Sequence, residues 1–218
     1  RREEARQRKA AQKRNQIFQR IGIGLAAILF IAGFIFVSSQ NRGSQGDLLN
    51  LQTINADNID GSPDAPVIIT EFGDFGCPAC RQWHLSGIKE RIQESFGEDV
   101  TFVFRHFPVI TLQSPKAAEA GQCAAEQGGF WPYHDYIYEQ GSGLNDDQLV
   151  AYAGQVGLDM TIFETCLDSG RYEDYVEADM RLARDVGARG TPTFLVNNQL
   201  VAAPTLSILT NAIREELE

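Results

Sequence analysis

A long, uninterrupted apolar run lies near the start of the chain. Residues 21–37 (IGIGLAAILFIAGFIFV) carry no charged side chain, and the uncharged stretch continues to Asn41. A helix rises about 1.5 Å per residue, so residues 21–41 are long enough to cross the hydrocarbon core of a bilayer. We therefore predict a transmembrane anchor over 21–41. A cleaved signal peptide is the alternative, but the basic region before the run is long and no A-x-A site follows it.

Charges on either side of this run predict its orientation. Residues 1–20 carry eight Lys or Arg and two Glu, whereas Arg42 stands nearly alone after the run. Basic residues mark the cytoplasmic side of a membrane helix, so we expect a cytoplasmic tail at 1–20 and an extracytoplasmic domain held at the cell membrane. The polar residues 42–57 between anchor and domain predict a flexible linker.

From residue 58 to residue 218 the pattern is that of an α/β domain. Residues 66–73 (PVIITEFG) and 99–109 (DVTFVFRHFPV) are apolar and β-branched, which is typical of buried strands. Between them, residues 77–96 predict one helix with Pro78 in its first turn, where the missing N–H costs nothing.

The second half of this domain predicts a helical insertion and a hairpin. Residues 112–187 hold five helical stretches separated by Gly-containing breaks. Residues 191–201 return to strand, with a turn at Asn197-Asn198, and residues 204–218 predict a last helix. The order of elements predicts a small mixed sheet with a helical insertion at about 112–187.

Charge excludes one class of partner. The chain has a net charge of −10, and the part that follows the basic tail carries −16. Nucleic-acid binding needs clustered Lys and Arg to neutralise phosphates, so we expect no nucleic-acid partner.

The chain has four cysteines: Cys77, Cys80, Cys123 and Cys166. An even number in an exported domain favours disulfides, and four cysteines allow three pairings. If Cys77 pairs with Cys80, the other two are left to pair with each other. Cys123 and Cys166 have no CxxC neighbour and no obvious base, so we interpret them as a structural disulfide; two buried free thiols are the alternative.

Cys77 and Cys80 form a CPAC motif, for which a redox pair, a local disulfide and half of a metal site are all possible. Cys77 stands at a strand-to-helix junction, where unpaired N–H groups and the helix dipole stabilise a thiolate. Cys80 lies one turn later and deeper. Thiol–disulfide exchange needs two sulfurs with different roles, so we interpret Cys77 as the sulfur that reacts with the substrate and Cys80 as the sulfur that resolves the mixed disulfide.

Several motifs together resemble one family. The segments GSPDAPVIITEFGDFGCPAC, GGFWPYHD, ETCLDSG and ARGTPTFLVNN are similar to those of the DsbA-like thioredoxin-fold thiol–disulfide oxidoreductases, from about Asn58 to the C-terminus. The resemblance implies that Pro192 is a cis-proline facing the disulfide, with Thr191 beside it. A cis X-Pro bond exposes the preceding backbone groups, which can pair with an extended substrate. Pro78 and Ala79 stand where the best-known DsbA has Pro-His, so the resemblance alone does not fix how oxidising the disulfide is.

Glu71 lies six residues before Cys77 in an otherwise apolar strand, where burying a carboxylate is costly. Thioredoxin-like proteins have an acid at this spacing, and the resemblance implies a proton acceptor behind Cys80 with a pKa raised by desolvation. A strand-edge Glu that reaches solvent is the alternative.

The remaining polar residues are interpreted conservatively. His84 and His106 could complete a zinc set with the cysteines, but an inward Cys80 and a reactive Cys77 argue against it. We therefore expect no metal and no cofactor. We interpret Asp74 as a loop acid and His134 as a packing residue.

Taken together, the sequence predicts an exported, membrane-tethered enzyme that donates the Cys77–Cys80 disulfide to substrate proteins with cysteines. The resemblance implies a membrane partner, a quinone-linked protein, that reoxidises it. A reductase or isomerase is one alternative. A non-catalytic chaperone or docking module of the same fold is the other.

Overall fold

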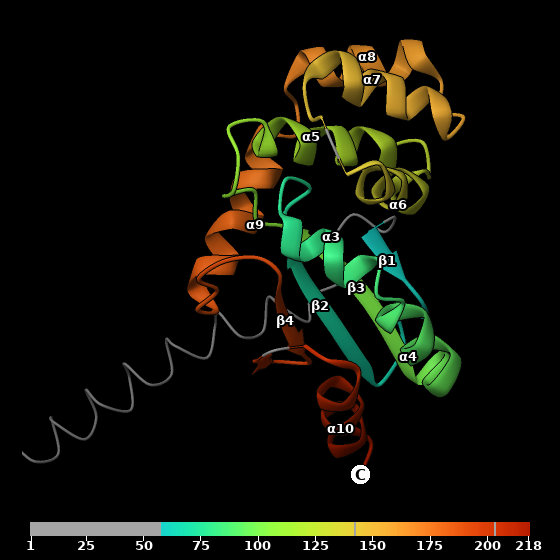
Figure 1. Ribbon diagram of the computed structural model, residues 1–218, viewed down its shortest axis with the longest axis vertical. Helices are drawn as coiled ribbons and strands as arrows, with labels where there is room; N and C mark the ends of the chain where they lie inside the picture. Colours follow the sequence, from blue (N-terminus) through green and yellow to red (C-terminus); the bar gives the residue numbers. More distant parts are fainter. Residues whose placement is uncertain (1–57, 142, 203) are drawn as a thin grey trace, which may run out of the picture. The chain divides into compact units, whose positions relative to one another are not determined.

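The computed structural model describes residues 58–141, 143–202 and 204–218 (Figure 1). The predicted tail, anchor and linker, residues 1–57, lie outside these ranges. In the part of the chain that is described, no helix is both long enough and apolar enough to cross a membrane.

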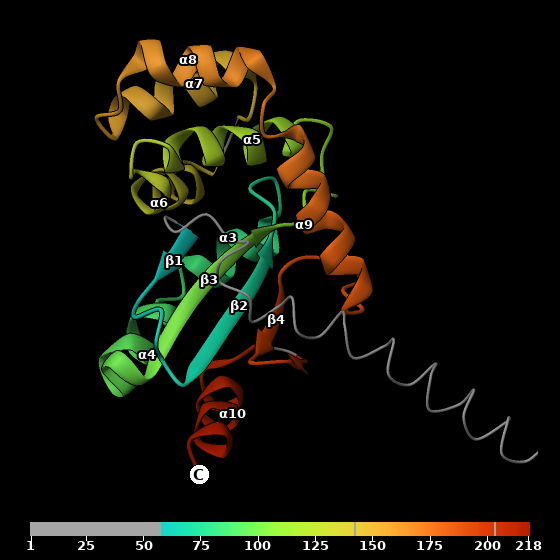
Figure 2. The same cartoon turned by 180° about the vertical axis from the view of Figure 1, so that it is seen from behind.

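The described residues form a five-stranded mixed sheet with the order β1-β3-β2-β4-β5 (Figure 2). β2 and β3 are parallel, and the other neighbouring pairs are antiparallel. A parallel pair needs a crossover, which α3 (Pro78–His84) and α4 (Ile88–Phe96) provide here. The strands are β1 (Ile59–Asp60), β2 (Val67–Gly73), β3 (Val100–His106), β4 (Thr193–Val196) and β5 (Gln199–Val201).

The described residues between β3 and β4 form five α-helices, which confirms the predicted helical insertion. The first four lie beyond one end of the sheet, and the fifth, α9, runs back along the sheet (Figure 1). The five are α5 (Ser114–Ala125), α6 (Phe130–Gln140), α7 (Asp146–Gln155), α8 (Met160–Ser169) and α9 (Glu173–Asp185).

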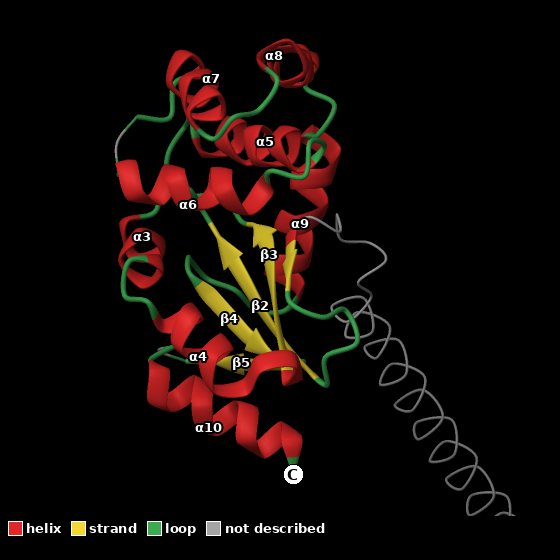
Figure 3. Cartoon of the chain, turned by 90° about the vertical axis from the view of Figure 1, so that its right-hand side faces the viewer, coloured by secondary structure: helices red, strands yellow, loops and turns green. Residues whose placement is uncertain are grey.

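Helices cover both faces of the sheet, so every residue of β2 and β3 is buried (Figure 3). On one face, side chains such as Ile69 pack with α4 and with the C-terminal helix α10 (Leu206–Leu217). On the other face, Phe72 packs with α9. The predicted thioredoxin-type α/β fold is therefore confirmed.

The crossover differs from its prediction. Residues 77–96 do not form one helix, because α3 ends at His84 and α4 begins only at Ile88. Gly87 between them has a φ of 68°, a left-handed conformation that glycine adopts without steric cost. The chain turns there, and the two short helices pack as separate pieces. The two-residue strand β1 was not predicted either, because it is too short to show a period.

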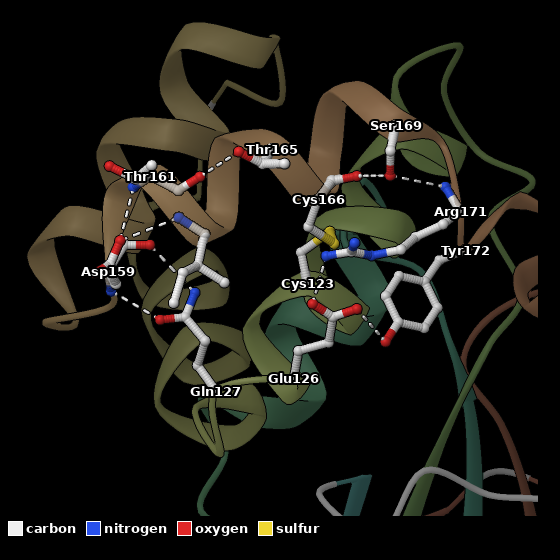
Figure 4. Close-up of polar contacts among 11 residues, drawn as sticks. Cys123, Glu126, Gln127, Asp159, Thr161, Thr165, Cys166, Ser169, Arg171 and Tyr172 are labelled. Carbon is white, nitrogen blue, oxygen red and sulfur yellow. Dashed lines mark hydrogen bonds and ion pairs between the residues drawn. A yellow bond between two sulfur atoms is a disulfide. The ribbon is translucent and has the colours of Figure 1, made fainter.

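A disulfide between Cys123 and Cys166 ties α5 to α8 within the insertion (Figure 4). Both cysteines are buried. Beside them, the Glu126 carboxylate accepts from Arg171 at 2.6 Å and from the Tyr172 hydroxyl at 2.8 Å. The two cysteines are 43 residues apart. Closing a loop of that length stabilises the fold by about 4 kcal/mol in the chain-entropy model.

Candidate active site

The two remaining cysteines lie where the chain passes from β2 into α3. Cys77 is the N-cap residue of α3 in an extended conformation, and Pro78 occupies the first helical turn. The loop before it is tightly packed: a Cβ on Gly76 would lie 2.7 Å from Ser114 Oγ. A glycine is thus required for the close approach of this loop to α5.

Asp74 organises this loop. Its side chain is 2% exposed and accepts hydrogen bonds from the backbone N–H groups of Gly76 (2.7 Å), Val109 and Ile110 (2.8 Å each). Its backbone carbonyl accepts from the Tyr138 hydroxyl at 3.2 Å. The interpretation of Asp74 as a mere loop acid was therefore wrong: its carboxylate joins the active-site loop to the segment after β3.

Cys77 has the environment of a stabilised thiolate. Its sulfur is free of any disulfide and donates to the backbone carbonyl of Thr191 at 3.1 Å. The pKa of Cys77 is lowered to about 5, chiefly by a hydrogen bond from the Cys80 thiol and further by Thr191. The Thr191 hydroxyl is buried and has no other partner, so it is available to donate to the thiolate once the thiol proton is lost.

Cys80 has the opposite environment. Its side chain is fully buried and also free of any disulfide. Burial raises the pKa of Cys80 far above its ordinary value, and the hydrogen bond to Cys77 adds to this effect. One sulfur is therefore ionised at neutral pH while the other holds its proton.

Glu71 lies on β2 and is 7% exposed, not at a solvent-facing edge. Desolvation raises the pKa of Glu71 to about 8, although the Lys89 ammonium opposes the shift; the Cys77 charge adds to it. In return, the Glu71 charge raises the pKa of Cys80. The carboxyl group is electrostatically coupled to both sulfurs and protonated at neutral pH.

Pro192 follows a cis peptide bond from Thr191. The two residues lie immediately before β4 and border a hollow of about 560 Å³ that also includes Leu200 and Pro204. The Thr191 carbonyl thus faces Cys77 while the neighbouring surface remains open. This arrangement brings together three predicted elements: the reacting sulfur, Thr191 and Pro192.

The histidines do not join the cysteines. Among the described residues, the one group of His, Cys, Asp or Glu side chains close enough to share a metal ion is His84, His134 and Asp135. His106 instead hydrogen-bonds Gln122 at 2.8 Å. Burial lowers the pKa of His106 to about 3 and that of His134 to about 4, so both are neutral packing residues. The described residues therefore do not bring Cys77, Cys80, His84 and His106 close enough together to share a zinc ion.

Two residues near the site were missed by sequence reasoning. Lys89 acts on Glu71 from α4, and Arg81 lines a groove beside Cys77. Both belong to helices whose charged positions normally face solvent, so the sequence offered no signal to distinguish them.

The site combines two free thiols of opposite acidity, a cis Thr191–Pro192 bond whose Thr191 carbonyl contacts the first sulfur, and a buried acid coupled to the second sulfur. This is the form of a thioredoxin-type thiol–disulfide exchange site. The chain belongs to the thioredoxin family, whose sequence profile matches residues 54–215.

Solved structures of related proteins share the fold. The oxidised BdbD of Bacillus subtilis has a TM-score of 0.70 and 25% identity over 77% of this chain and 95% of that protein. A thioredoxin-like oxidoreductase from Silicibacter pomeroyi DSS-3 has a TM-score of 0.67 and 25% identity, over 76% and 96% of the two chains. These likenesses support the class of thiol–disulfide oxidoreductase.

Curated relatives match this chain over only part of their own length. The Na(+)/H(+) antiporter NhaA of Herminiimonas arsenicoxydans is 37% identical over 143 residues, which is 66% of this chain and 22% of that protein. NhaA 1 of Mycolicibacterium gilvum (strain PYR-GCK) is 29% identical over 196 residues, 85% of this chain and 31% of that protein. The chain spans between about a fifth and a third of the length of these relatives.

Proposed function

We propose that this chain is a membrane-tethered, extracytoplasmic oxidoreductase that donates the Cys77–Cys80 disulfide to exported proteins with cysteines. The observation that carries the proposal is the contrast between a Cys77 pKa lowered to about 5 and a Cys80 pKa raised by burial. A stabilised thiolate favours the reduced pair, and a stable reduced pair makes its disulfide a strong oxidant. The tether is proposed from the apolar residues 21–41 alone.

The reaction proceeds through a mixed disulfide. A substrate thiolate attacks the Cys77 sulfur of the oxidised pair, the S–S bond breaks, and its electron pair leaves on Cys80. Glu71, with a pKa of about 8, is protonated at neutral pH and supplies the proton that Cys80 takes up. A second substrate thiolate then attacks the substrate sulfur, Cys77 leaves as a thiolate, and the substrate keeps the new disulfide.

Thr191 and Pro192 would hold the substrate during these steps. The Thr191 carbonyl lies 3.1 Å from the Cys77 sulfur and accepts a hydrogen bond from it only while Cys77 is a protonated thiol. In the oxidised pair and in the mixed disulfide Cys77 has no proton to donate, so the carbonyl can accept an N–H from an extended substrate backbone. The adjoining hollow offers apolar contact from residues such as Leu200.

Each turnover leaves the pair reduced, so an acceptor of two electrons and two protons is needed. We propose a quinone-linked membrane protein for this role, as the resemblance to DsbA-like proteins implies. A tether would keep both redox partners at one membrane surface and raise their effective concentration.

The reduction potential of Cys77–Cys80 tests the proposal. The full chain is equilibrated in glutathione buffers, alkylated and analysed by mass, which separates this pair from Cys123–Cys166. A potential near or above about −150 mV is expected for a disulfide donor. A potential near or below about −250 mV would overturn donation and indicate a reductase.

A non-catalytic docking module of the same fold gives a different result under alkylation. If the pair is redox-active, mild reduction exposes one rapidly alkylated thiol with a low pKa, at Cys77. If the cysteines are only structural, mild reduction exposes no such thiol.

A further inference from the structure

A groove of about 500 Å³ opens beside Cys77, and the mechanism above makes no use of it. It is bounded by the active-site loop, α3, the segment before α5, and the end of α6 with the chain that follows. Its walls combine apolar side chains with neutral polar ones. They include Phe75, Ile137, Tyr138, Leu144, Gln113, Asn145 and Gln148.

Arg81 is the one Lys, Arg, Asp or Glu among the described residues that line this groove. The chain after its basic tail carries a net charge of −16, so a wall with a cation and no carboxylate departs from its average composition. Arg81 follows Cys77 by four residues, which places both side chains on the same side of α3.

The guanidinium of Arg81 is held in place by one hydrogen bond, and its other donors have no partner among the described residues. Its Nη2 donates to the backbone carbonyl of Glu139 at 3.2 Å, and its Nε is buried without a partner. Gly141, with a φ of 68°, makes room for it: a Cβ there would lie 2.3 Å from Nε. None of the ion pairs formed among the described residues involves Arg81.

We infer that Arg81 binds a carboxylate of the substrate, on an acidic residue close to the cysteine that reacts with Cys77. A guanidinium presents five donors in a fork that fits a carboxylate, and among the residues that the structure describes this fork makes one hydrogen bond, to Glu139. In the oxidised pair and in the mixed disulfide the Cys77 sulfur carries no charge, so no charged group in the described lining balances Arg81 when a substrate binds. The inference rests on the proposed function, because it requires Cys77 to bond to a substrate sulfur.

A purely local role for Arg81 makes a different prediction. If Arg81 only stabilised the Cys77 thiolate, its removal would slow reactions with all substrates by the same factor. A substrate-binding role changes the ratio between acidic and neutral substrates instead. The ratio of two rates, measured on the same protein, therefore separates the two roles.

The test uses the full chain with Cys80→Ala, reduced, and peptides whose single cysteine is activated as a 2-pyridyl disulfide. The Cys77 thiolate attacks the peptide sulfur, a new S–S bond forms, and pyridine-2-thione leaves and is followed by its absorbance. Two peptides differ only in Glu or Gln at the positions flanking the cysteine. We expect the Glu peptide to react roughly fivefold to tenfold faster, the range of a modest charge-assisted contact.

Substitutions locate the effect. Arg81→Gln should bring the Glu-to-Gln ratio to about one, and Arg81→Lys should leave an intermediate ratio because the charge remains without the fork. Arg91→Gln, at an exposed position of α4 outside the groove, makes the same change in net charge and should keep the wild-type ratio.

A ratio of one in the wild-type protein, or a preference that survives Arg81→Gln, overturns the inference. The small neutral reagent 2,2′-dithiodipyridine separates this result from failure of the proposed function. If that reagent reacts rapidly with Cys77 and the peptides still show no preference, only the role of Arg81 is wrong. If it does not react, Cys77 is not a nucleophile, and both proposals fail together.

Discussion

Cys77 and Cys80 are three residues apart, yet their neighbours give the two sulfurs opposite acidities. The hydrogen bond between them lowers the pKa of Cys77 and raises that of Cys80, and Thr191 and Glu71 strengthen the contrast. The chemistry of the pair is thus set by single side chains that come from β2 and from the turn before β4.

Thr191→Val tests one of these side chains. The substitution removes the hydroxyl that stabilises the thiolate, so the pKa of Cys77 should rise from about 5 toward its ordinary value. The pH dependence of thiolate ultraviolet absorbance in the reduced protein measures the shift. Thr191→Ser keeps the hydroxyl and should change the pKa less. An unchanged pKa in the valine variant would mean that the hydroxyl does not contact the thiolate.

Glu71→Gln tests the buried carboxyl through stability. The folded-state pKa of about 8 lies above the ordinary 4.5, so the carboxyl favours folding at low pH and this contribution is lost as pH rises from about 4.5 to about 8. The glutamine variant lacks that loss. Its free energy of unfolding relative to the wild-type protein should therefore increase over the same range, as measured by urea denaturation. A difference that is constant with pH would show that Glu71 reaches solvent.

At the scale of elements, the Cys123–Cys166 disulfide holds α5 against α8. Replacing both cysteines by alanine should lower the free energy of unfolding by about 2–4 kcal/mol, because the 43-residue loop is no longer closed in the unfolded chain. Denaturation in urea measures the loss. The rate of alkylation of Cys77 in the same variant is the control and should stay the same, since this pair is proposed as structural; a slowed rate would contradict that assignment.

The elements that the sequence predicted best are those with a clear hydrophobic periodicity or with a Gly, Pro or Asn residue that ends the element. The buried strands β2 and β3, the five insertion helices and the Asn197-Asn198 hairpin follow from local patterns. The break in the crossover at Gly87 did not, because one glycine in an amphipathic stretch is compatible with a continuous helix. The sequence could identify the cysteines, Glu71 and Pro192 as candidate site residues, partly through the family resemblance. It could not identify the role of Asp74, because the backbone groups that its carboxylate binds at Val109 and Ile110 are distant in the sequence.

At the scale of the whole molecule, the acidity of one thiol is linked to the stability of the reduced fold. A thiolate pKa of about 5 in the folded protein lies below the ordinary 9.0. This group therefore stabilises the reduced protein most above about pH 9, and the contribution is lost as pH falls through about 5. The oxidised protein has no such titration, because a disulfide sulfur binds no proton.

The two redox forms should consequently respond differently to pH. We expect the reduced protein to gain stability relative to the oxidised protein as pH rises from about 5 to about 9. Urea denaturation of both forms at a series of pH values measures the difference, with alkylation and mass analysis to verify that Cys123–Cys166 stays intact. A thermodynamic cycle ties this difference to the reduction potential, since whatever stabilises the reduced fold makes the disulfide more oxidising. If the oxidised form were the more stable at every pH, the protein would resist giving up its disulfide, and donation would be the wrong direction of exchange.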